Sequence, residues 1–421
     1  MYLDDLVLVL DASFIPANRD LPYVNGIAAH AIHCADIIAA SGVRVSFILH
    51  SYTEGITAPA VRETRILDQY PAVVVEFDVD IPTEPVARAF ECALNIVAAP
   101  TRTEFPMVYH QSLTMIPFTS IDSRAIVTNH TPFVRHVADW ASWTMARRTF
   151  TPDAATPLGP RKFEDLLDAE DRGLAALRER EYIMCAEISA LQVSWLRSQG
   201  IHPRRISEIP RPLELPAVND VDTPPQPLQG LLATADVTAV TAVSQLNHFK
   251  NVELFVLGCC LALDSGDIDF AVMVGGPERD TERERIRQLV PGHLKDVFAF
   301  FPRLGHQALV RDLFRGLAGR GIFVCSSRFD LVPYTALEAA RAGLCTIVAD
   351  LPTVGARESV PDRYRFRPTP AGLAACLRRV AVEEDGISDF SPIAAAIRQE
   401  TADDTFLTAF DNLCSRFSMP A

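Results

Sequence analysis

The sequence predicts an α/β protein with two domains, each built on a doubly wound parallel sheet. Short apolar segments without polar alternation are separated by helical segments along the chain, which is typical of strands covered by helices on both faces. A proline-rich stretch at 208–230 has neither a helical nor a strand period and interrupts this alternation. The chain has 421 residues, which is too many for a single core. We therefore expect two Rossmann-like domains that face a central cleft, where proteins of this class bind ligands.

The first domain, residues 1–212, is predicted from a series of apolar strand segments. Its first helix, Gly26–Ala40, follows a loop with two prolines and ends at Ser41-Gly42, where glycine stops the helix. The expected strands are Leu6–Leu10, Val43–Leu49, Val73–Phe77, Met107–Tyr109, Ala125–Thr128 and Tyr182–Ala186.

The second domain, residues 231–396, repeats the pattern after a linker at 213–230. Helices are expected from Val252, from about Thr281, from His306 and over Tyr334–Ala342. The expected strands are Val237–Val243, Phe270–Val274, Val297–Phe301, Ile322–Cys325 and Thr346–Ala349. The last segment, about 397–421, is predicted to be a helix that packs back on the first domain.

Composition and charge exclude several classes of function. The chain carries 53 acidic and 39 basic residues, a net charge of −14, and both halves are acidic. Neither half offers the positive field that nucleic acid or an anionic membrane requires. No apolar run approaches the ~20 residues of a membrane span, and the acidic start does not resemble a signal peptide. The nine cysteines include no C-x-x-C pair and lie mostly among apolar residues, which predicts buried free thiols and a cytoplasmic protein.

The segment from Cys325 to Glu358 carries the strongest functional signal. A strand ends at Cys325, a loop carries Asp330 out of its carboxyl edge, and Pro333 stands where the first turn of a helix begins. The N–H groups of that turn have no partners within the helix, so they can hold an anion. Glu338 lies two turns along, which lets both acids flank one ligand at the helix start. The alternative is that Asp330 only caps the helix and that Glu338 is a solvated residue.

The same segment resembles the E-x7-E signature of the retaining glycosyltransferases of family 4, which have the two-domain GT-B architecture. The residues in register are Ser326, Ser327, Asp330, Glu338, Ala339, Ala340 and Gly343, with Asp330 in place of the first Glu. The resemblance implies that Asp330 holds hydroxyls of the donor sugar and that Glu338 holds the ribose of the nucleotide. It also implies that backbone amides between the two acids meet the diphosphate. The donor-binding segment is then Leu331, Val332, Pro333, Tyr334 and Thr335.

Other segments extend the resemblance over most of the chain. Residues 243–251 are similar to the family motif V-G-R-L-x-x-x-K-N, whose Arg and Lys clamp the leaving diphosphate. Lys250, one of only three lysines, matches this motif, and Gln245 stands in the place of the Arg. Gly275 lies in a V-G-G-P-E segment that resembles the family's V-G-x-G-P-E at a strand end. The alternatives are an ordinary surface lysine and an ordinary turn glycine.

Two residues of the first domain complete the resemblance. Gly26 fits the Gly-rich loop and helix that face the phosphates, and His130 follows a strand in the position that places a His near the anomeric carbon. A turn glycine and a loop histidine with a structural role are the alternatives. The resemblance assigns catalysis to His130, Lys250 and Asp330. It assigns donor binding to Gly26, Gln245, Lys250, Gly275, Asp330, 331–335 and Glu338.

We predict a retaining glycosyltransferase that moves a hexosyl or N-acetylhexosaminyl group from a UDP- or GDP-linked donor to an acceptor hydroxyl. The first domain lacks the basic amphipathic helix that docks on lipid, which favours a soluble small-molecule acceptor. Arginine outnumbers lysine 36 to 3, as in GC-rich genomes, and this context suggests a secondary metabolite such as an antibiotic. The sequence does not indicate the oligomeric state.

Three alternatives remain for the function. The chain is also compatible with a nucleotide-sugar epimerase or hydrolase of the same fold, with a disaccharide phosphorylase, and with a non-catalytic nucleotide-sugar-binding partner subunit. His30 and His33 share a helix but form no metal set in the sequence, and no D-x-D motif is present. No metal or other cofactor is therefore expected beside the nucleotide-sugar co-substrate.

Overall fold

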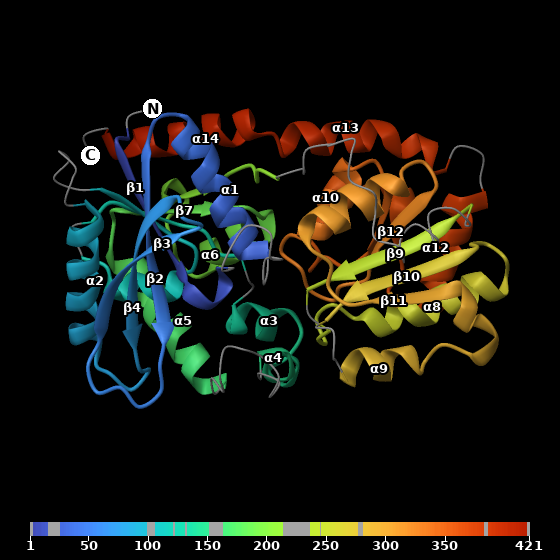
Figure 1. Ribbon diagram of the computed structural model, residues 1–421, viewed down its shortest axis with the longest axis horizontal. Coiled ribbons are helices and arrows are strands. Elements are labelled where there is room, and N and C mark those ends of the chain that lie inside the picture. The colour runs from blue at the N-terminus through green and yellow to red at the C-terminus, as the bar shows by residue number, and fades with distance from the viewer. Residues whose placement is uncertain are drawn as a thin grey trace. The chain divides into compact units, whose positions relative to one another are not determined.

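The computed structural model describes residues 3–15, 26–98, 106–120, 123–130, 133–150, 163–213, 236–244, 246–276, 281–382 and 386–418 (Figure 1). The chain divides into two compact units, which are residues 1–212 with 402–421, and residues 213–401. Each unit is built around a sheet that is wholly or largely parallel, so the predicted fold class is confirmed. The expected linker at 213–230 lies outside the described residues from 214 onward.

The described part of the first unit forms one sheet with the strand order β3-β4-β2-β1-β5-β6-β7-β8. Neighbouring strands are parallel except for the pair β3 and β4. The strands are β1 Asp5–Asp11, β2 Arg44–Tyr52, β3 Ala60–Ile66, β4 Tyr70–Phe77, β5 Met107–His110, β6 Ala125–Val127, β7 Ile183–Glu187 and β8 Ile206–Glu208. The direction in which strands are added reverses between β1 and β5, which makes their carboxyl ends a topological switch point.

The apolar pattern of the sequence misses two strands of this sheet, β3 and β8. The sequence of β3 is AVRETRI, and most of its side chains are exposed or half-buried at the sheet edge. A hairpin joins β3 to β4 through Leu67 and Asp68, whose φ angles of 53° and 56° suit a tight turn between antiparallel strands. Charged side chains on an edge strand discourage pairing with other chains, so such a strand lacks the apolar run that identifies a buried one.

Helices cover both faces of the first sheet, and one of them comes from the far end of the chain. The helices are α1 Gly26–Ala40, α2 Thr83–Ala98, α3 Val134–Trp140, α4 Trp143–Phe150, α5 Phe163–Glu179, α6 Ala190–Ser198 and α14 Asp403–Ser415 (Figure 1). The ring centroids of Tyr109 on β5 and Phe410 on α14 lie 5.6 Å apart. His33 on α1 forms a 3.0 Å hydrogen bond with Asp403 at the start of α14. These contacts make α14 part of the first unit.

The described part of the second unit forms a fully parallel sheet with the order β11-β10-β9-β12-β13-β14. The strands are β9 Thr238–Val243, β10 Phe270–Gly275, β11 Phe298–Phe301, β12 Gly321–Cys325, β13 Cys345–Ala349 and β14 Arg365–Phe366. Numbered along the chain, this is the order 3-2-1-4-5-6 of a dinucleotide-binding domain. The switch point lies between β9 and β12.

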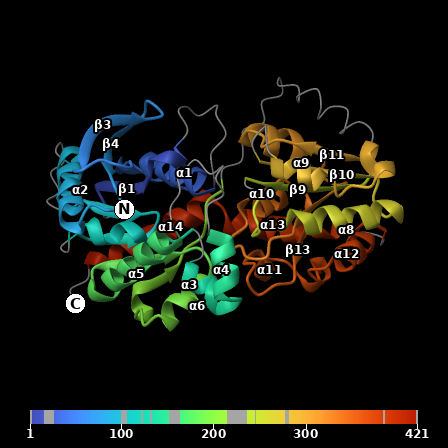
Figure 2. The same ribbon diagram turned by 90° about the horizontal axis from the view of Figure 1, so that it is seen from below.

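The helices of the second unit lie on the two faces of this sheet. They are α8 Val252–Asp264, α9 Thr281–Arg287, α10 Tyr334–Arg341, α11 Ala356–Ser359, α12 Pro370–Val382 and α13 Ser391–Glu400. Figure 1 shows α8 and α9 below the strands and α10 above them, and α8 lies in front of the strands when seen from below in Figure 2. The helix expected from His306 is a π-helix over Gln307–Phe314, on the connection from β11 to β12.

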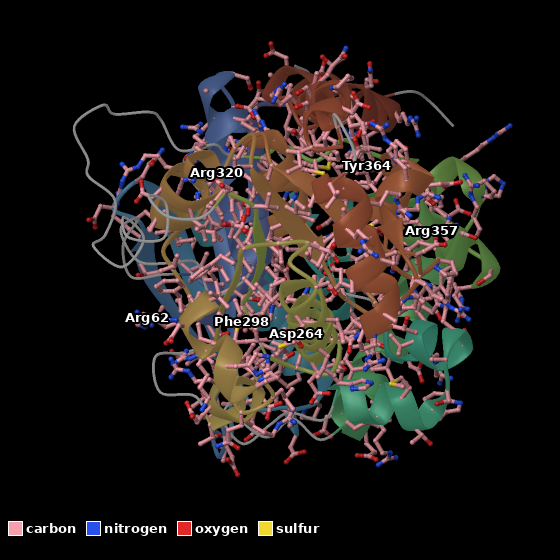
Figure 3. All side chains as sticks on the ribbon, turned by 90° about the vertical axis from the view of Figure 1, so that its right-hand side faces the viewer. Arg62, Asp264, Phe298, Arg320, Arg357 and Tyr364 are labelled. Atoms are coloured by element: carbon pink, nitrogen blue, oxygen red, sulfur yellow. The ribbon has the colours of Figure 1, made fainter. Side chains whose placement is uncertain are left out.

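Large apolar side chains form the core of the second unit, and one of its buried residues, Tyr364, is labelled in Figure 3. Tyr364, for example, is fully buried and meets Phe390 edge to face at 5.1 Å. The nine cysteines are free thiols, of which eight are buried and Cys92 is exposed, so the expectation of buried thiols is wrong for Cys92 alone. None of the described helices is both long enough and apolar enough to cross a bilayer.

Candidate functional site

The candidate site of the second unit is built on the loops that follow β9 and β12, at the switch point of its sheet. Two hydrogen bonds to backbone carbonyls join these loops. The amide of Arg328 donates to the carbonyl of Phe249 at 2.7 Å, and the hydroxyl of Ser326 donates to the carbonyl of Lys250 at 3.0 Å. The chain therefore brings the Lys250 segment and the Asp330 segment to the same edge of the sheet, although they are far apart in sequence.

Lys250 and Asp330 form an ion pair in this place. Nζ of Lys250 donates to Oδ2 of Asp330 at 2.5 Å, and the hydroxyl of Ser327 donates to the same oxygen at 3.3 Å. Burial opposes the charge of Lys250, but the adjacent Asp330 carboxylate outweighs this effect and raises the pKa of Lys250 above its ordinary value. Lys250 is thus a cation in a partly desolvated setting, where its charge acts more strongly on a ligand than it would in water.

A loop after β13 holds the backbone of Asp330. The amide of Asp330 donates to the carbonyl of Thr353 at 2.9 Å, and the amide of Gly355 donates to the carbonyl of Asp330 at 2.8 Å. The first residue of α10 lies four positions further on, its N-cap is Pro333, and no side chain caps this helix. The interpretation of Asp330 as a helix cap is therefore wrong, because its carboxylate pairs with Lys250 instead.

The predicted donor-binding segment 331–335 leads from Asp330 into the first turn of α10. Leu331 and Pro333 are buried, whereas Val332, Tyr334 and Thr335 are half-buried. Within α10, the amides of Ala336 and Leu337 donate to the carbonyl of Pro333. The amides of the first helical positions lie outside this intrahelical pattern, and the helix dipole adds partial positive charge there. This end of α10 is suited to an anionic group.

Glu338 is buried on α10, with 8% of its surface exposed. Its Oε1 lies 3.1 Å from Nε2 of His306, which is the residue before the π-helix. The interpretation of Glu338 as a solvated residue is therefore wrong. The two acids of the motif each have a basic partner, since Asp330 contacts Lys250 and Glu338 contacts His306.

The end of β10 approaches the end of β9 closely at Gly275. A Cβ on Gly275 would lie 2.8 Å from Cγ2 and 2.9 Å from the carbonyl oxygen of Val243, so only glycine fits without a shift of β9. The next residue, Gly276, has a φ of +71°, and its carbonyl accepts a 2.8 Å hydrogen bond from the amide of Arg303. These contacts align the loops after β9, β10 and β11 along one sheet edge. Gln245, the remaining predicted donor residue, lies outside the described residues.

In the first unit, His130 follows β6 and is held by two neighbours. Its Nε2 lies 2.8 Å from Oε1 of Gln111, the residue after β5, and its ring meets that of His30 edge to face at 4.8 Å. Burial, and then the charge of Arg211, lower the pKa of His130 to about 3. His130 is therefore neutral at pH 7. Because the amide oxygen of Gln111 can only accept, the Nε2 of His130 carries the proton of the ring.

The residue before His130 is fixed by a buried acid. Glu187, at the end of β7, is fully buried and accepts hydrogen bonds from the side-chain amide of Asn129 at 2.6 Å and from its backbone amide at 3.3 Å. Burial raises the pKa of Glu187 to about 8. The side-chain oxygen of Asn129 accepts from the amide of Leu113 at 3.2 Å. This network sets the path of the backbone that leads to His130.

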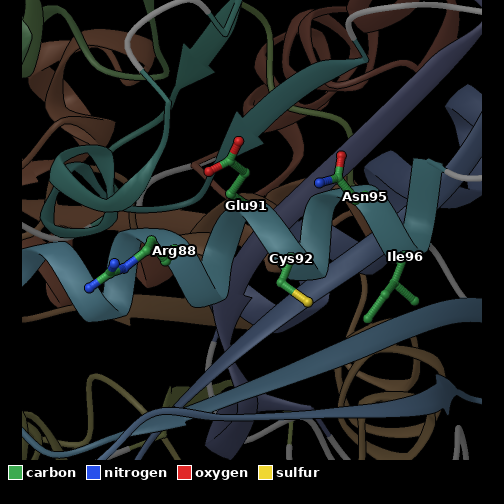
Figure 4. A pocket seen from close by; sticks show the side chains of 5 residues that line it. All are labelled: Arg88, Glu91, Cys92, Asn95 and Ile96. Atoms are coloured by element: carbon green, nitrogen blue, oxygen red, sulfur yellow. The ribbon is translucent and has the colours of Figure 1, made fainter.

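The remaining predicted residue, Gly26, is the first residue of α1, and the loop before it lies outside the described residues. In the described part of the chain, no three His, Cys, Asp or Glu side chains lie close enough to hold one metal ion. A surface hollow of about 550 Å³ lies along α2 and is lined by Arg88, Glu91, Cys92, Asn95 and Ile96 (Figure 4). None of the predicted site residues lines it.

The structure brings Lys250, Asp330 and Glu338 to one edge of the second sheet, and it places His130 and Gly26 in the first unit. Sequence reasoning missed three of the partners described above, namely His306, Gln111 and Glu187. They share one signal, which is their place at the carboxyl end of a strand: Glu187 is the last residue of β7, Gln111 directly follows β5, and His306 lies five residues after β11. In parallel sheets, side chains at carboxyl ends of strands face the ligand-binding edge.

Comparisons with known proteins agree with this architecture. No family model matches the chain, and no curated protein matches it. Among solved structures, it is similar to sucrose-phosphate synthase (tll1590) from Thermosynechococcus elongatus, with a TM-score of 0.64, 15% identity, and 99% of this chain and 97% of that chain covered. An α,α-trehalose-phosphate synthase (UDP-forming) from Burkholderia vietnamiensis gives a TM-score of 0.63 at 12% identity, with 100% and 99% covered. Anabaena Alr3699/HepE in complex with UDP and glucose gives 0.63 at 14% identity, with 98% and 99% covered. At these identities the similarity establishes the fold alone: the chain has the two-domain α/β fold of GT-B enzymes.

Proposed function

We propose that the protein is a retaining glycosyltransferase that uses a nucleoside-diphosphate sugar as donor. The observation that carries this proposal is the juxtaposition, at the switch point of the second unit, of Lys250, Asp330 and the first turn of α10. A cation and a helix N-terminus suit a diphosphate, and an acid beside them suits the hydroxyls of a sugar. Solved structures of similar fold include a synthase named as UDP-forming and a protein in complex with UDP and glucose, which supports a UDP-linked donor.

In this proposal the second unit holds the donor. The amides at the start of α10 and Nζ of Lys250 meet the diphosphate, Asp330 accepts hydrogen bonds from sugar hydroxyls, and Glu338 accepts them from the ribose. As the bond between the anomeric carbon and the phosphate oxygen breaks, negative charge grows on the leaving nucleoside diphosphate. Preorganised donors bind this transition state more tightly than the ground state, which is how they accelerate the reaction.

The acceptor hydroxyl attacks the anomeric carbon from the face that the diphosphate leaves, and a phosphate oxygen takes its proton. The new glycosidic bond forms as the old bond breaks, so the configuration of the sugar is kept and no protein nucleophile is needed. His130 is neutral at pH 7 because burial lowers its pKa to about 3, and it therefore acts by hydrogen bonding rather than by charge. We propose that the acceptor is a soluble small molecule bound by the first unit, in the cytoplasm.

A thermal-shift panel of UDP-, GDP- and ADP-linked sugars tests donor binding, because a bound donor raises the unfolding temperature by mass action. A donor that stabilises the protein is then incubated with candidate acceptors, and release of nucleoside diphosphate is measured together with the anomeric configuration of the product. We expect stabilisation by at least one class of donor and a product with the anomeric configuration of the donor. Failure of every donor to shift the melting temperature would refute the proposal, and a product with inverted configuration would refute the retaining mechanism.

A further inference from the structure

The contact between His306 and Glu338 joins two segments that lie 32 residues apart in sequence. His306 is half-buried, with 21% of its side chain exposed, and the side chain of Glu338 is 11% exposed. Their separation of 3.1 Å between Nε2 and Oε1 is a hydrogen bond in which one oxygen of the carboxylate is engaged. The second oxygen, Oε2, is the one that remains for a ligand.

The topology of the sheet explains why a residue that follows β11 can reach α10. Strand β11 is the outermost strand on one side of β9, and β12 lies directly on the other side. The connection between β11 and β12 therefore crosses over the sheet at the switch point, and its helix contacts α10. His306 is the residue at which this crossover begins. It thus stands beside the place where a ligand bound across the carboxyl ends of the strands has to lie.

The crossover helix has unusual geometry, since it is a π-helix over all of Gln307–Phe314. Such helices are rare and are frequently found at functional sites. The segment before the helix is held in place as well. The amide of Arg303 donates to the carbonyl of Gly276 at 2.8 Å, and the amide of Leu309 donates to the carbonyl of Gly305 at 2.9 Å. These bonds on both sides fix the backbone that carries His306.

We propose that His306 is a positioning residue of the nucleoside site. It holds Oε1 of Glu338, so that Oε2 is presented to the ribose hydroxyls of a nucleoside diphosphate. This proposal rests on the donor role proposed for Glu338 above. A glutamate side chain has several rotatable bonds, and fixing its carboxylate before the ligand arrives reduces the entropy that binding removes. The expected consequence is selectivity for ribose over deoxyribose that depends on His306, although His306 itself does not touch the ribose.

Isothermal titration with nucleotides tests this proposal directly. The ligands are UDP, GDP and ADP, together with the 2′-deoxy and 3′-deoxy counterparts of whichever binds most tightly. The proteins are the full-length wild type, His306→Ala, His306→Gln and Glu338→Gln. His293→Ala is a matched control, because His293 forms a similar 2.7 Å hydrogen bond with Asp264 on an exposed surface of the same unit (Asp264 is labelled in Figure 3).

We expect the wild type and His293→Ala to prefer the ribonucleotide over at least one deoxynucleotide by about tenfold, the size of one hydrogen bond to a charged group. His306→Ala should lose most of this preference while its affinity for that deoxynucleotide stays the same. Glu338→Gln should lose the preference too. His306→Gln should keep most of it, because its amide nitrogen lies near the position of Nε2 and can donate to the carboxylate.

Several outcomes would overturn the proposal. If His306→Ala keeps the full ribose preference, or loses affinity equally for ribo- and deoxynucleotides, His306 does not act through Glu338. If the wild type binds a nucleoside diphosphate without ribose preference, Glu338 does not meet the ribose. A wild type that binds none of the nucleotides would refute the proposed function itself, and this result is distinct because it is seen before any variant is made.

Discussion

The ammonium nitrogen of Lys250 lies 2.5 Å from Oδ2 of Asp330, across the loops that follow β9 and β12. We propose that Lys250 contacts the leaving phosphate and that Asp330 contacts the sugar. The two charges neutralise each other, so a bound donor has to share Lys250 with Asp330. The pair therefore couples the two ends of the bond that breaks, and substitutions of the two partners should have different effects.

Lys250→Ala should lower turnover by about 10²–10³-fold, the usual cost of removing one preorganised group that stabilises transition-state charge. Lys295→Ala is the matched control, since Lys295 is an exposed lysine of the same unit. Steady-state kinetics with the donor found by thermal shift, supported by melting curves of both variants, give the comparison. Wild-type turnover in Lys250→Ala would remove Lys250 from the phosphate site.

Asp330→Asn should reduce turnover by at least tenfold without weakening the binding of free nucleoside diphosphate. The reason is that the amide loses the charge-assisted hydrogen bonds to the sugar, while Lys250 loses its internal partner and becomes more available to phosphate. Asp330→Glu should retain part of the activity, because the resembling family carries Glu in this position. Titration calorimetry with the diphosphate separates the two effects, and a fully active Asp330→Asn would show that the carboxylate has no part in the reaction.

Glu338→Gln should weaken the binding of both the intact donor and the free nucleoside diphosphate. The side chain keeps its shape but exchanges a charged acceptor for a neutral one, a loss of about 1–2 kcal/mol, or roughly five- to thirtyfold in Kd. Glu284→Gln, on the exposed face of α9, is the control. Equal diphosphate affinity in the two variants would exclude Glu338 from the nucleotide site.

Gly275→Ala should destabilise the second unit, because the new methyl group would lie 2.9 Å from the carbonyl oxygen of Val243. Overpacking of this kind costs about 1–3 kcal/mol, which corresponds to a drop of several degrees in melting temperature. Gly292→Ala is a matched control, because a Cβ there meets nothing within 4 Å. A melting temperature of Gly275→Ala equal to that of the control would mean that the strand ends are less closely packed than the structure shows.

The buried acids of the first unit predict a pH dependence of stability. Burial raises the pKa of Glu170 and of Glu187 to about 8, so the folded protein binds protons that the unfolded chain releases above about pH 4.5. The stabilisation that these two acids give the folded protein is complete below about pH 4.5 and is lost as the pH rises toward 8. Burial lowers the pKa of His110 and His130 to about 3, so the unfolded chain binds protons on these residues that the folded protein does not. They therefore make the protein less stable as the pH falls below about 6.5.

The two effects oppose each other in mild acid, whereas between pH 6.5 and 8.5 the histidines no longer contribute and the acids still do. We therefore expect the melting temperature to fall over that interval, with each acid contributing about 1.4 kcal/mol per unit of pH at most. Glu187→Gln should flatten the fall, whatever its own stability, when melting curves are recorded at half-unit steps. A wild type whose melting temperature rises from pH 6.5 to 8.5 would contradict the protonated state of these acids.

The sequence predicted the buried parallel strands and the residues of local motifs, because both have a signal within a short window. Lys250 and the two acids of the motif are predicted in this way. The partners of Glu338, His130 and Asn129 have no such local signal. His306 lies 32 residues from Glu338, Gln111 lies 19 residues from His130, and Glu187 lies 58 residues from Asn129. Such pairs form through the order of strands in the sheet, and no local pattern encodes that order.

The edge strand β3 and the π-helix show a second limit of sequence reasoning. The charged residues of β3 suit an exposed edge but hide the strand from a search for apolar runs. The π-helix has the same amphipathic periodicity as an ordinary helix over its eight residues, so the sequence predicts a helix there without indicating its wider turn. Both features depend on neighbours in space rather than on neighbours along the chain.

The return of α14 to the first unit also has a consequence for synthesis of the protein. The first unit consists of residues 1–212 and 402–421, whereas all of the second unit lies between them. On the ribosome, the strands of the first sheet emerge early, but Tyr109 stays without Phe410 until the final helix has been translated. We therefore expect the second unit to reach its native state first, and the earlier half of the chain to need protection from aggregation until residues 402–421 have been translated.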